Sequence, residues 1–237
     1  MIDLNCDMGE GIGNDEAIMP YITSANIACG YHAGDENIMK QTVELCLQYN
    51  VAIGAHPSYF DRGNFGRNDI DLSVEQVYTL VKKQIQLLKE ITEESKALLR
   101  HVKPHGALYN KSAKNVDVAK AIAMAVKDVD EDLILFGLSG GYSIVEAKNL
   151  GLKTRSEVFA DRTYQDNGSL TPRTQVNAMI EDEEKSIQQV LQMVHEGFVT
   201  TVSGKSISII AETVCIHGDG KNAVQFARRL NEVLKVS

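Results

Sequence analysis

The chain has 237 residues, of which 43% are hydrophobic and 24% charged, and its formal net charge at pH 7 is −8. This composition is that of a soluble globular protein long enough to bury a sizeable core. The negative charge argues against nucleic acid as a partner, because phosphate binding needs a basic surface. An anionic metabolite is not excluded, since local cations can override the overall sign.

Membrane and secretion signals are absent from the sequence. No apolar run approaches the roughly 18 residues of a membrane-spanning helix. No basic region followed by an apolar one opens the chain, so we expect no signal peptide. The four cysteines form no Cys-x-x-Cys pair, and we expect buried thiols in a reducing compartment: Cys6, Cys29, Cys46 and Cys215. The sequence therefore predicts a cytoplasmic protein.

Short strand-like runs alternate with helical patterns along the chain, which favours an α/β fold with parallel strands. In chain order, the predicted strands cover 2–6, 25–29, 51–55, 100–104, 133–137, 153–160 and 212–216. The predicted helices cover 36–49, 74–94, 115–129, 143–149, 175–196 and 221–235. Asp35 is the expected N-cap of the first helix, and Ser73 and Gln76 form a capping box before the second.

Residues 199–210 predict a β-hairpin that turns at Ser203, Gly204 and Lys205. The Gly-Lys-Ser sequence resembles the end of a phosphate-binding loop. That motif needs glycine five residues before Gly204, where Val199 stands, so we interpret this stretch as a plain turn. No other stretch makes a nucleotide-binding loop, and no repeat or low-complexity linker interrupts the chain. The simplest organisation is a single domain over residues 1–237.

Apolar and polar residues alternate along four of the predicted strands. An open doubly wound sheet is apolar on both faces and does not alternate in this way. A barrel does, because one face packs on helices and the other lines the interior. We therefore predict a seven-stranded (β/α) barrel with an open polar mouth, whose inward residues are Asp3, Asn5, Asp7, Ala52, Gly54, His56, His101, Lys103, His105, Arg155, Glu157, Phe159 and Asp161.

Four histidines and four aspartates fall at or just past predicted strand ends. In α/β barrels these ends form one rim, which holds the active site. The residues concerned are His32, His56, His105, His217, Asp7, Asp35, Asp161 and Asp219. Some have simpler explanations: Asp7 as a turn former, Asp35 as a helix cap, and His217 with Asp219 as a glycine-rich helix entry.

Cationic side chains near the same rim suggest anion binding. A buried Lys103 must be paired, with Glu157 or Asp7, or must bind a substrate carboxylate. Arg62 and Arg67 lie in a glycine-rich loop and either clamp an anion or decorate the surface. The long loop 159–173 contributes further candidates, namely Arg162, Tyr164 and Arg173.

One aspartate with two or three histidines suits a divalent metal such as Zn²⁺, Mn²⁺ or Ni²⁺. Such a metal would activate water for attack on a carbonyl. Without metal, the same groups can perform general acid–base catalysis with His105 or Asp7 as the base. The residues come from different strands, so their spacing does not decide between these alternatives.

Six sequence blocks together resemble the lactam utilisation (LamB/YcsF) family. They are DLNCDMGEG, ANIACGYHAGD, GAHPSYFDRGNFGR, VKPHGALYN, EVFADRTYQDNGSLTPR and CIHGDG, which span most of the chain in order. Two departures concern loop details. Asn68 replaces the second arginine of the usual GFGRR, and Gly220-Lys221 replaces the threonine and proline of HGDTP.

The resemblance implies a subunit of the bacterial ATP-dependent 5-oxoprolinase, which opens 5-oxo-L-proline to L-glutamate. It implies two partner subunits, and the missing phosphate-binding loop suggests that ATP binds mainly to them or at an interface shared with them. It also implies a barrel of the glycoside hydrolase/deacetylase type, many of whose members hold a metal with one aspartate and two histidines. A homo-oligomer is compatible with this interpretation.

The resemblance and the rim together assign expected roles to individual residues. The expected catalytic residues are Asp7, Lys103, His105 and Glu157; the expected metal ligands are Asp7, His32 and His56. The expected substrate-binding residues are Asn5, Arg62, Arg67, Asp161, Arg162 and Arg173. The alternative functions are a stand-alone metal-dependent amidase or deacetylase-like hydrolase, and a non-catalytic subunit that only binds a metabolite.

Overall fold

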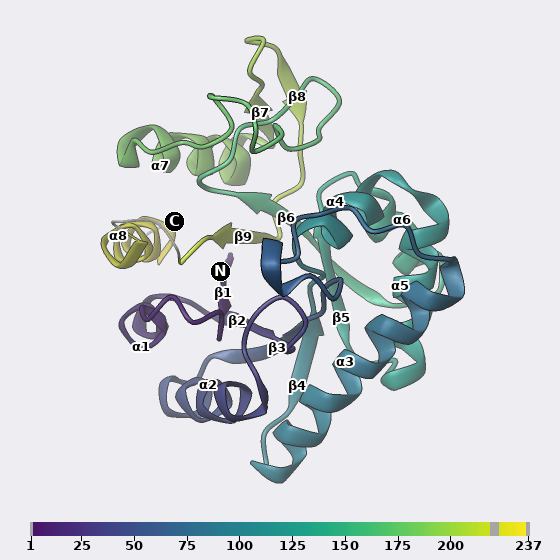
Figure 1. Cartoon of the computed structure of the whole chain (residues 1–237). Coiled ribbons are helices and arrows are strands. Elements are labelled where there is room, and N and C mark those ends of the chain that lie inside the picture. Colours follow the sequence, from purple (N-terminus) through teal and green to yellow (C-terminus); the bar gives the residue numbers. More distant parts are fainter. Residues whose placement is uncertain (1, 219–222, 236–237) are drawn as a thin grey trace.

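A closed barrel of seven parallel strands forms the centre of the molecule (Figure 1). This computed structural model describes residues 2–218 and 223–235. The strands are β1 (Asp3–Met8), β2 (Ser24–Ala28), β3 (Ala52–His56), β4 (Leu99–Val102), β5 (Ile134–Leu138), β6 (Lys153–Phe159) and β9 (Thr213–Ile216). β9 pairs with both β1 and β6 and so closes the barrel, which confirms the predicted fold.

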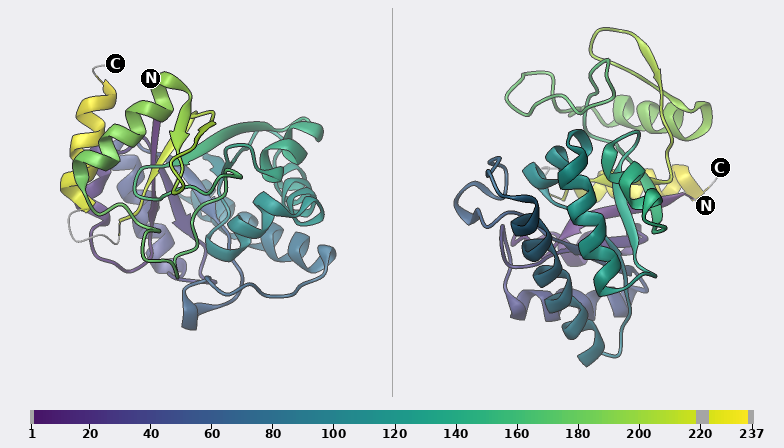
Figure 2. Two further views of the ribbon diagram at one scale, coloured as in Figure 1. Left: turned by 90° about the horizontal axis from the view of Figure 1, so that it is seen from above. Right: turned by 90° about the vertical axis from the view of Figure 1, so that its right-hand side faces the viewer.

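Helices surround the barrel, and Figure 2 shows them packed around the strands from two further sides. They are α1 (Asp15–Ile18), η1 (Met19–Tyr21), α2 (Glu36–Tyr49), η2 (Arg62–Asn64), α3 (Val74–Glu94), α5 (Val116–Val129), α6 (Tyr142–Asn149) and α8 (Ala223–Lys235). Asp35 caps α2 by accepting from Ile38 N, and both hydrogen bonds of the Ser73–Gln76 capping box are formed at α3. The predicted start of the last helix at 221, like Asp219, lies outside the described residues.

The short helices α1, η1 and η2 were not predicted, and neither was one longer helix. α4 (Gly106–Lys114) begins directly after the Pro104-His105 exit of β4, where proline and glycine suggested a loop. Its first turn is held by a tertiary contact, since Ala107 N donates to Gly66 O at 2.9 Å. A nine-residue helix is marginal by itself, so this packing decides its formation.

The helix predicted over 175–196 is shorter than expected. α7 covers Glu183–Leu191 and continues into a π-helical turn, η3 (Gln192–Glu196). Asp182 caps it by accepting from Lys185 N at 3.0 Å. The preceding residues instead bond back to the loop after β6, because Ile180 N donates to Asp161 O at 2.9 Å. The chain between β6 and β9 therefore forms an excursion beside the barrel.

The predicted hairpin is present on this excursion. β7 (Phe198–Thr200) pairs antiparallel with β8 (Ser206–Ser208) outside the barrel. In Figures 1 and 2 the hairpin and α7 project together to one side of the strands. The excursion thus brings a long loop, 160–182, over the mouth of the barrel while leaving the seven-strand closure intact.

The barrel interior is polar, as the alternation predicted. At its base, Ser24 Oγ donates to Asp3 Oδ1 at 2.6 Å, and above this Asn5 bonds Glu157, Asn26 and Thr213. The apolar core lies between the strands and the helices. The cysteines predicted as thiols, Cys6, Cys29, Cys46 and Cys215, are buried there or against the barrel interior and unpaired within the described ranges. No helix in those ranges is both long and apolar enough to cross a membrane.

Candidate active site

A cavity of about 500 Å³ opens at the C-terminal ends of the barrel strands. Parallel strands deliver their exit residues to one rim, and side chains from five of them line the cavity. These side chains are Asp7 and Glu10 from β1 and the turn after it, His56 from β3, Lys103 and His105 after β4, Phe159 from β6 and His217 after β9. The predicted convergence on one rim is therefore present in the structure.

Lys103 lies at the centre of the cavity floor, and its side chain is 3% exposed. Its ammonium is 2.9 Å from Asp7 Oδ1 and 2.9 Å from Glu157 Oε1. It also donates to Asn5 Oδ1 and Cys215 Sγ. Of the two alternatives for this lysine, the structure shows the internal pairing, so its donors are committed before any substrate arrives.

The ion pairs of Lys103 determine the charge states of Lys103 and Asp7 at the floor of the cavity. Burial alone would lower the pKa of Lys103, but Asp7, Cys215 and Glu157 raise it well above its ordinary value. Burial would raise the pKa of Asp7, but His56 and Lys103 hold it well below the usual range. Asp7 is therefore an ionised carboxylate at neutral pH, and Asn5 lies beneath it as part of the support.

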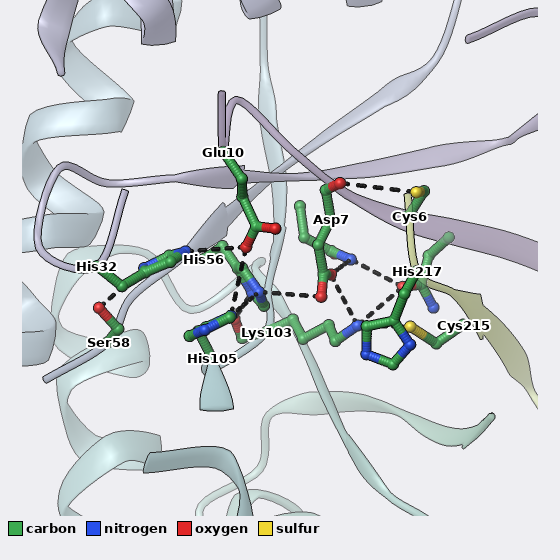
Figure 3. A network of polar contacts seen from close by, with 12 residues as sticks. Cys6, Asp7, Glu10, His32, His56, Ser58, Lys103, His105, Cys215 and His217 are labelled. Carbon is green, nitrogen blue, oxygen red and sulfur yellow. Dashed lines mark hydrogen bonds and ion pairs between the residues drawn. The ribbon is translucent and has the colours of Figure 1, made fainter. Parts of the chain in front are cut away.

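Glu10, His32, His56 and His105, hereafter the histidine cluster, form one wall of the site (Figure 3). His32 Nε2 is 3.0 Å from Glu10 Oε1, and His105 Nδ1 is 2.9 Å from His56 Nε2. The rings of His32 and His105 stack with centroids 3.8 Å apart. Asp7 Oδ2 lies 3.3 Å from His56 Nε2, so Asp7 borders this group.

Backbone and hydroxyl groups hold the three imidazoles in place. His56 Nδ1 bonds Lys103 O at 2.6 Å, His105 Nε2 bonds Phe65 O at 2.9 Å, and His32 Nδ1 bonds Ser58 Oγ at 2.9 Å. Burial lowers the pKa of His32 to about 4. Burial, with His56 and His32 alongside, lowers the pKa of His105 well below its ordinary value. His32 and His105 are thus neutral at pH 7.

A second polar group lies at the end of β9, close to Asp7. His217 Nδ1 donates to Asp161 Oδ2 at 2.8 Å, and Arg173 donates to His217 Nε2 at 3.1 Å. Burial alone would lower the pKa of His217, but Asp161 raises it. Asp161 therefore orients His217 and does not itself line the cavity wall, whereas Arg173 and His217 do.

The remaining predicted arginines have different surroundings. Arg62 donates to the carbonyls of Gly30 and Gly34 and does not line the cavity. Arg162 is buried and donates to Thr171 and Ala178 carbonyls, which fixes the loop over the mouth. Arg67 lines the cavity and packs over the Phe65 ring at 5.1 Å. The expected Arg62–Arg67 clamp is therefore not formed, because backbone carbonyls occupy Arg62.

The sequence profile of the LamB/YcsF family matches residues 2–237. The chain belongs to the LamB/YcsF family. It is 54% identical to the A-type 5-oxoprolinase subunit of Shouchella clausii (strain KSM-K16), over 99% of this chain and 94% of that protein. It is 52% identical to the A-type 5-oxoprolinase subunit of Oceanobacillus iheyensis, over 99% and 93% respectively.

One solved structure agrees with this membership in the LamB/YcsF family, and a second shares the fold. The lactam utilization protein from Thermus thermophilus superposes with a TM-score of 0.91 at 40% identity, covering 99% of this chain and 96% of that one. A putative cellobiose-phosphate cleavage protein from Enterococcus faecalis V583 has a TM-score of 0.55 at 14% identity, covering 98% and 92%. The latter shares the fold alone.

Several residues that line the cavity were not predicted from the sequence, among them Glu10 and Tyr109. Glu10 belongs to a stretch interpreted as a glycine turn, but Gly9, with φ of 71°, turns the chain so that the Glu10 side chain points back into the site. Tyr109 lies on the unpredicted α4, and burial and Glu157 raise its pKa well above the ordinary value. The sequence did contain one signal for Glu10, since it is an acidic residue three positions after Asp7 in the turn that follows a predicted strand. Tyr164, by contrast, is a core residue whose hydroxyl accepts from Phe159 N.

Proposed function

We propose that this chain is the subunit of an ATP-dependent 5-oxoprolinase that opens the lactam of 5-oxo-L-proline to L-glutamate. Two further subunits and ATP hydrolysis complete the reaction. The observation that carries the proposal is the similarity, across 99% of the chain, to proteins named as the A-type subunit of 5-oxoprolinase. That naming of the relatives supports action within a complex.

The cavity is suited to a small molecule that has both an amide and a carboxylate. The cationic groups Arg173 and Lys114 lie on its lining, as do the acid–base groups of Asp7 and the histidine cluster. We place the substrate carboxylate against Arg173, because the donors of Lys103 are already committed. This orientation directs the lactam carbonyl toward Asp7 and His105.

Ring opening adds water to the carbonyl carbon and breaks the bond to nitrogen. Asp7 or His105 takes the proton from the attacking water. When Arg173 turns from His217 Nε2 to the substrate carboxylate, His217, whose pKa Asp161 raises, carries a proton on Nε2 and delivers it to the departing nitrogen. Lys103 and Glu157 act by holding the Asp7 carboxylate in place.

ATP serves in this proposal to activate an unstrained and resonance-stabilised amide. Transfer of the γ-phosphoryl group of ATP to the carbonyl oxygen makes the carbonyl carbon a better target for water. Cleavage of the bond to nitrogen then leaves an acyl phosphate, and a second water hydrolyses it to glutamate and inorganic phosphate. The sequence lacks a phosphate-binding loop at Gly204, so we assign the ATP site mainly to the partner subunits or to an interface shared with them.

The decisive experiment is reconstitution of the full chain with its two partner subunits. We expect glutamate to form from 5-oxoproline only when ATP and all subunits are present. Asp7→Asn should lower kcat by at least about 100-fold. His195→Ala, which changes an exposed histidine on η3, should leave it unchanged. Hydrolysis of an N-acetyl sugar or simple amide by the chain alone, without ATP, would favour the stand-alone hydrolase instead.

A further inference from the structure

The facing nitrogens of His56 and His105 both carry lone pairs. His56 Nδ1 contacts Lys103 O at 2.6 Å, and a carbonyl oxygen only accepts, so Nδ1 bears the hydrogen. His105 Nε2 contacts Phe65 O at 2.9 Å, so it bears the hydrogen of that ring. In their neutral forms, His56 Nε2 and His105 Nδ1 are therefore unprotonated, yet they lie 2.9 Å apart.

The ring hydrogen of His32 can be assigned in the same way, from its hydrogen-bond partners. The Ser58 hydroxyl donates to Tyr59 O at 3.0 Å and therefore accepts from His32 Nδ1. This leaves a lone pair on His32 Nε2, which lies 3.0 Å from the Glu10 Oε1 acceptor. Asp7 Oδ2 is a further acceptor, 3.3 Å from His56 Nε2. With the three imidazoles neutral, lone pairs face one another at three contacts. A proton on His56 Nε2 relieves the contacts of that atom with Asp7 and His105, and a bound cation relieves those within the histidine cluster.

The geometry of these donors matches metal coordination. One donor atom each from Glu10, His32, His56 and His105 lies within 4.8 Å of the others. Ligands of a tetrahedral zinc ion with bonds of about 2.0–2.1 Å lie about 3.3 Å apart. Three pairs of these donor atoms are separated by 2.9, 3.0 and 3.5 Å. Each imidazole also donates its outer N–H to an oxygen, which is the usual support of a metal-binding histidine.

We propose that Glu10, His32, His56 and His105 bind one divalent ion of the Zn²⁺ class through Glu10 Oε1, His32 Nε2, His56 Nε2 and His105 Nδ1. Three imidazoles and one carboxylate favour such a metal over Mg²⁺ or Ca²⁺, which prefer oxygen ligands. Asp7 borders the site, because Lys103 and Asn26 hold its Oδ1. Compared with the expected ligands Asp7, His32 and His56, this set contains Glu10 and His105 in place of Asp7. With His105 as a ligand, Asp7 is the base of the proposed reaction.

The ion would lie at the cavity wall, where Glu10, His56 and His105 are part of the lining. A metal held by these residues would polarise a carbonyl or lower the pKa of a bound water. The binding proposal itself does not depend on 5-oxoproline as substrate, since it follows from the donor atoms alone. Its test is therefore separate from the test of the proposed reaction.

The test is calorimetric titration of the chelator-treated full chain with Zn²⁺, followed by metal analysis after desalting. We expect one equivalent bound with a sub-micromolar Kd and a raised Tm in the presence of Zn²⁺. Glu10→Gln and His105→Gln should each weaken binding by about 10- to 100-fold or more. His195→Gln is the matched control, because His195 is exposed and lies outside the cluster, and it should bind like the unchanged protein.

Folding of each variant is checked by circular dichroism, and the tautomers are read by ¹⁵N NMR of the unchanged protein. The expected tautomers are Nδ1–H for His56 and Nε2–H for His105. Absence of Zn²⁺ binding by the unchanged chain would overturn the proposal. So would unaltered affinity in the folded Glu10 and His105 variants, or a proton shared between His56 and His105 that persists when Zn²⁺ is added.

Discussion

Gly54 on β3 lies directly beside the His101 ring inside the barrel, where a Cβ at Gly54 would be 2.0 Å from His101 Nε2. The ring uses this space to donate from Nε2 to Asn26 Oδ1 at 2.8 Å and to stack on Phe136. Because Gly54 has no side chain, the imidazole of His101 on the neighbouring strand fits inside the barrel. There it supports Asn26, which in turn bonds Asn5 and Asp7.

Gly54→Ala should destabilise the protein by about 3 kcal/mol, because the buried ring has no free space to move into. Urea unfolding measures the change. Gly63→Ala is the control: nothing lies within 4 Å of a Cβ at Gly63, so we expect a change within about 0.5 kcal/mol. Equal unfolding midpoints for the two variants would contradict the packing described at Gly54.

Lys103→Met should lower the free energy of unfolding by about 3–5 kcal/mol, because it leaves Asp7 and Glu157 as buried carboxylates without their cation. Lys153→Met removes an exposed partner of Asp132 and should cost no more than about 1 kcal/mol. Denaturant titration of both variants provides the comparison. A Lys103 variant as stable as the Lys153 variant would show that the central pairing is dispensable.

Asp161→Asn should lower the pKa of His217, because the Asp161 carboxylate is what raises it against the effect of burial. An NMR titration of the His217 ring measures the shift directly. A raised histidine pKa contributes stability below the unfolded value of about 6.5, and this contribution is lost as pH rises through the folded pKa. The unchanged protein should therefore exceed the Asp161→Asn variant in stability by more near pH 6 than near pH 9. A difference that widens with pH would contradict this pairing.

Arg173→Ala should raise the KM for 5-oxoproline by about 10- to 100-fold in the reconstituted enzyme, because it removes the proposed charged partner of the substrate carboxylate. Arg228→Ala changes an exposed arginine that pairs with Glu232 on α8, and it should leave KM unchanged. Steady-state kinetics at saturating ATP make the comparison. Equal KM values would contradict the role of Arg173 and would favour Lys114 or Arg67, which also line the cavity, as the partner of the substrate carboxylate.

The sequence by itself determined the architecture and the location of the site. Ile2, Leu4 and Cys6 alternate with Asp3, Asn5 and Asp7, and side chains of a strand alternate between its two faces. A sheet with one apolar and one polar buried face closes into a barrel, so the strand count and the rim followed from local patterns. The long, amphipathic and well-capped helices α2 and α3 were predictable for the same reason: their signals are local.

Only the tertiary structure decided which rim residues meet. Asp7 and Glu10 are close neighbours in the chain, and the turn at Gly9 places Glu10 among the histidines while Asp7 faces Lys103. Arg62 is held by the carbonyls of Gly30 and Gly34, which lie 32 and 28 positions away in the chain and which no local pattern of arginine and glycine reveals. The nitrogen that each imidazole presents to the cavity depends on a distant carbonyl or hydroxyl. Side-chain chemistry is encoded locally, but hydrogen-bond partners are set by the closure of the barrel and the paths of its loops.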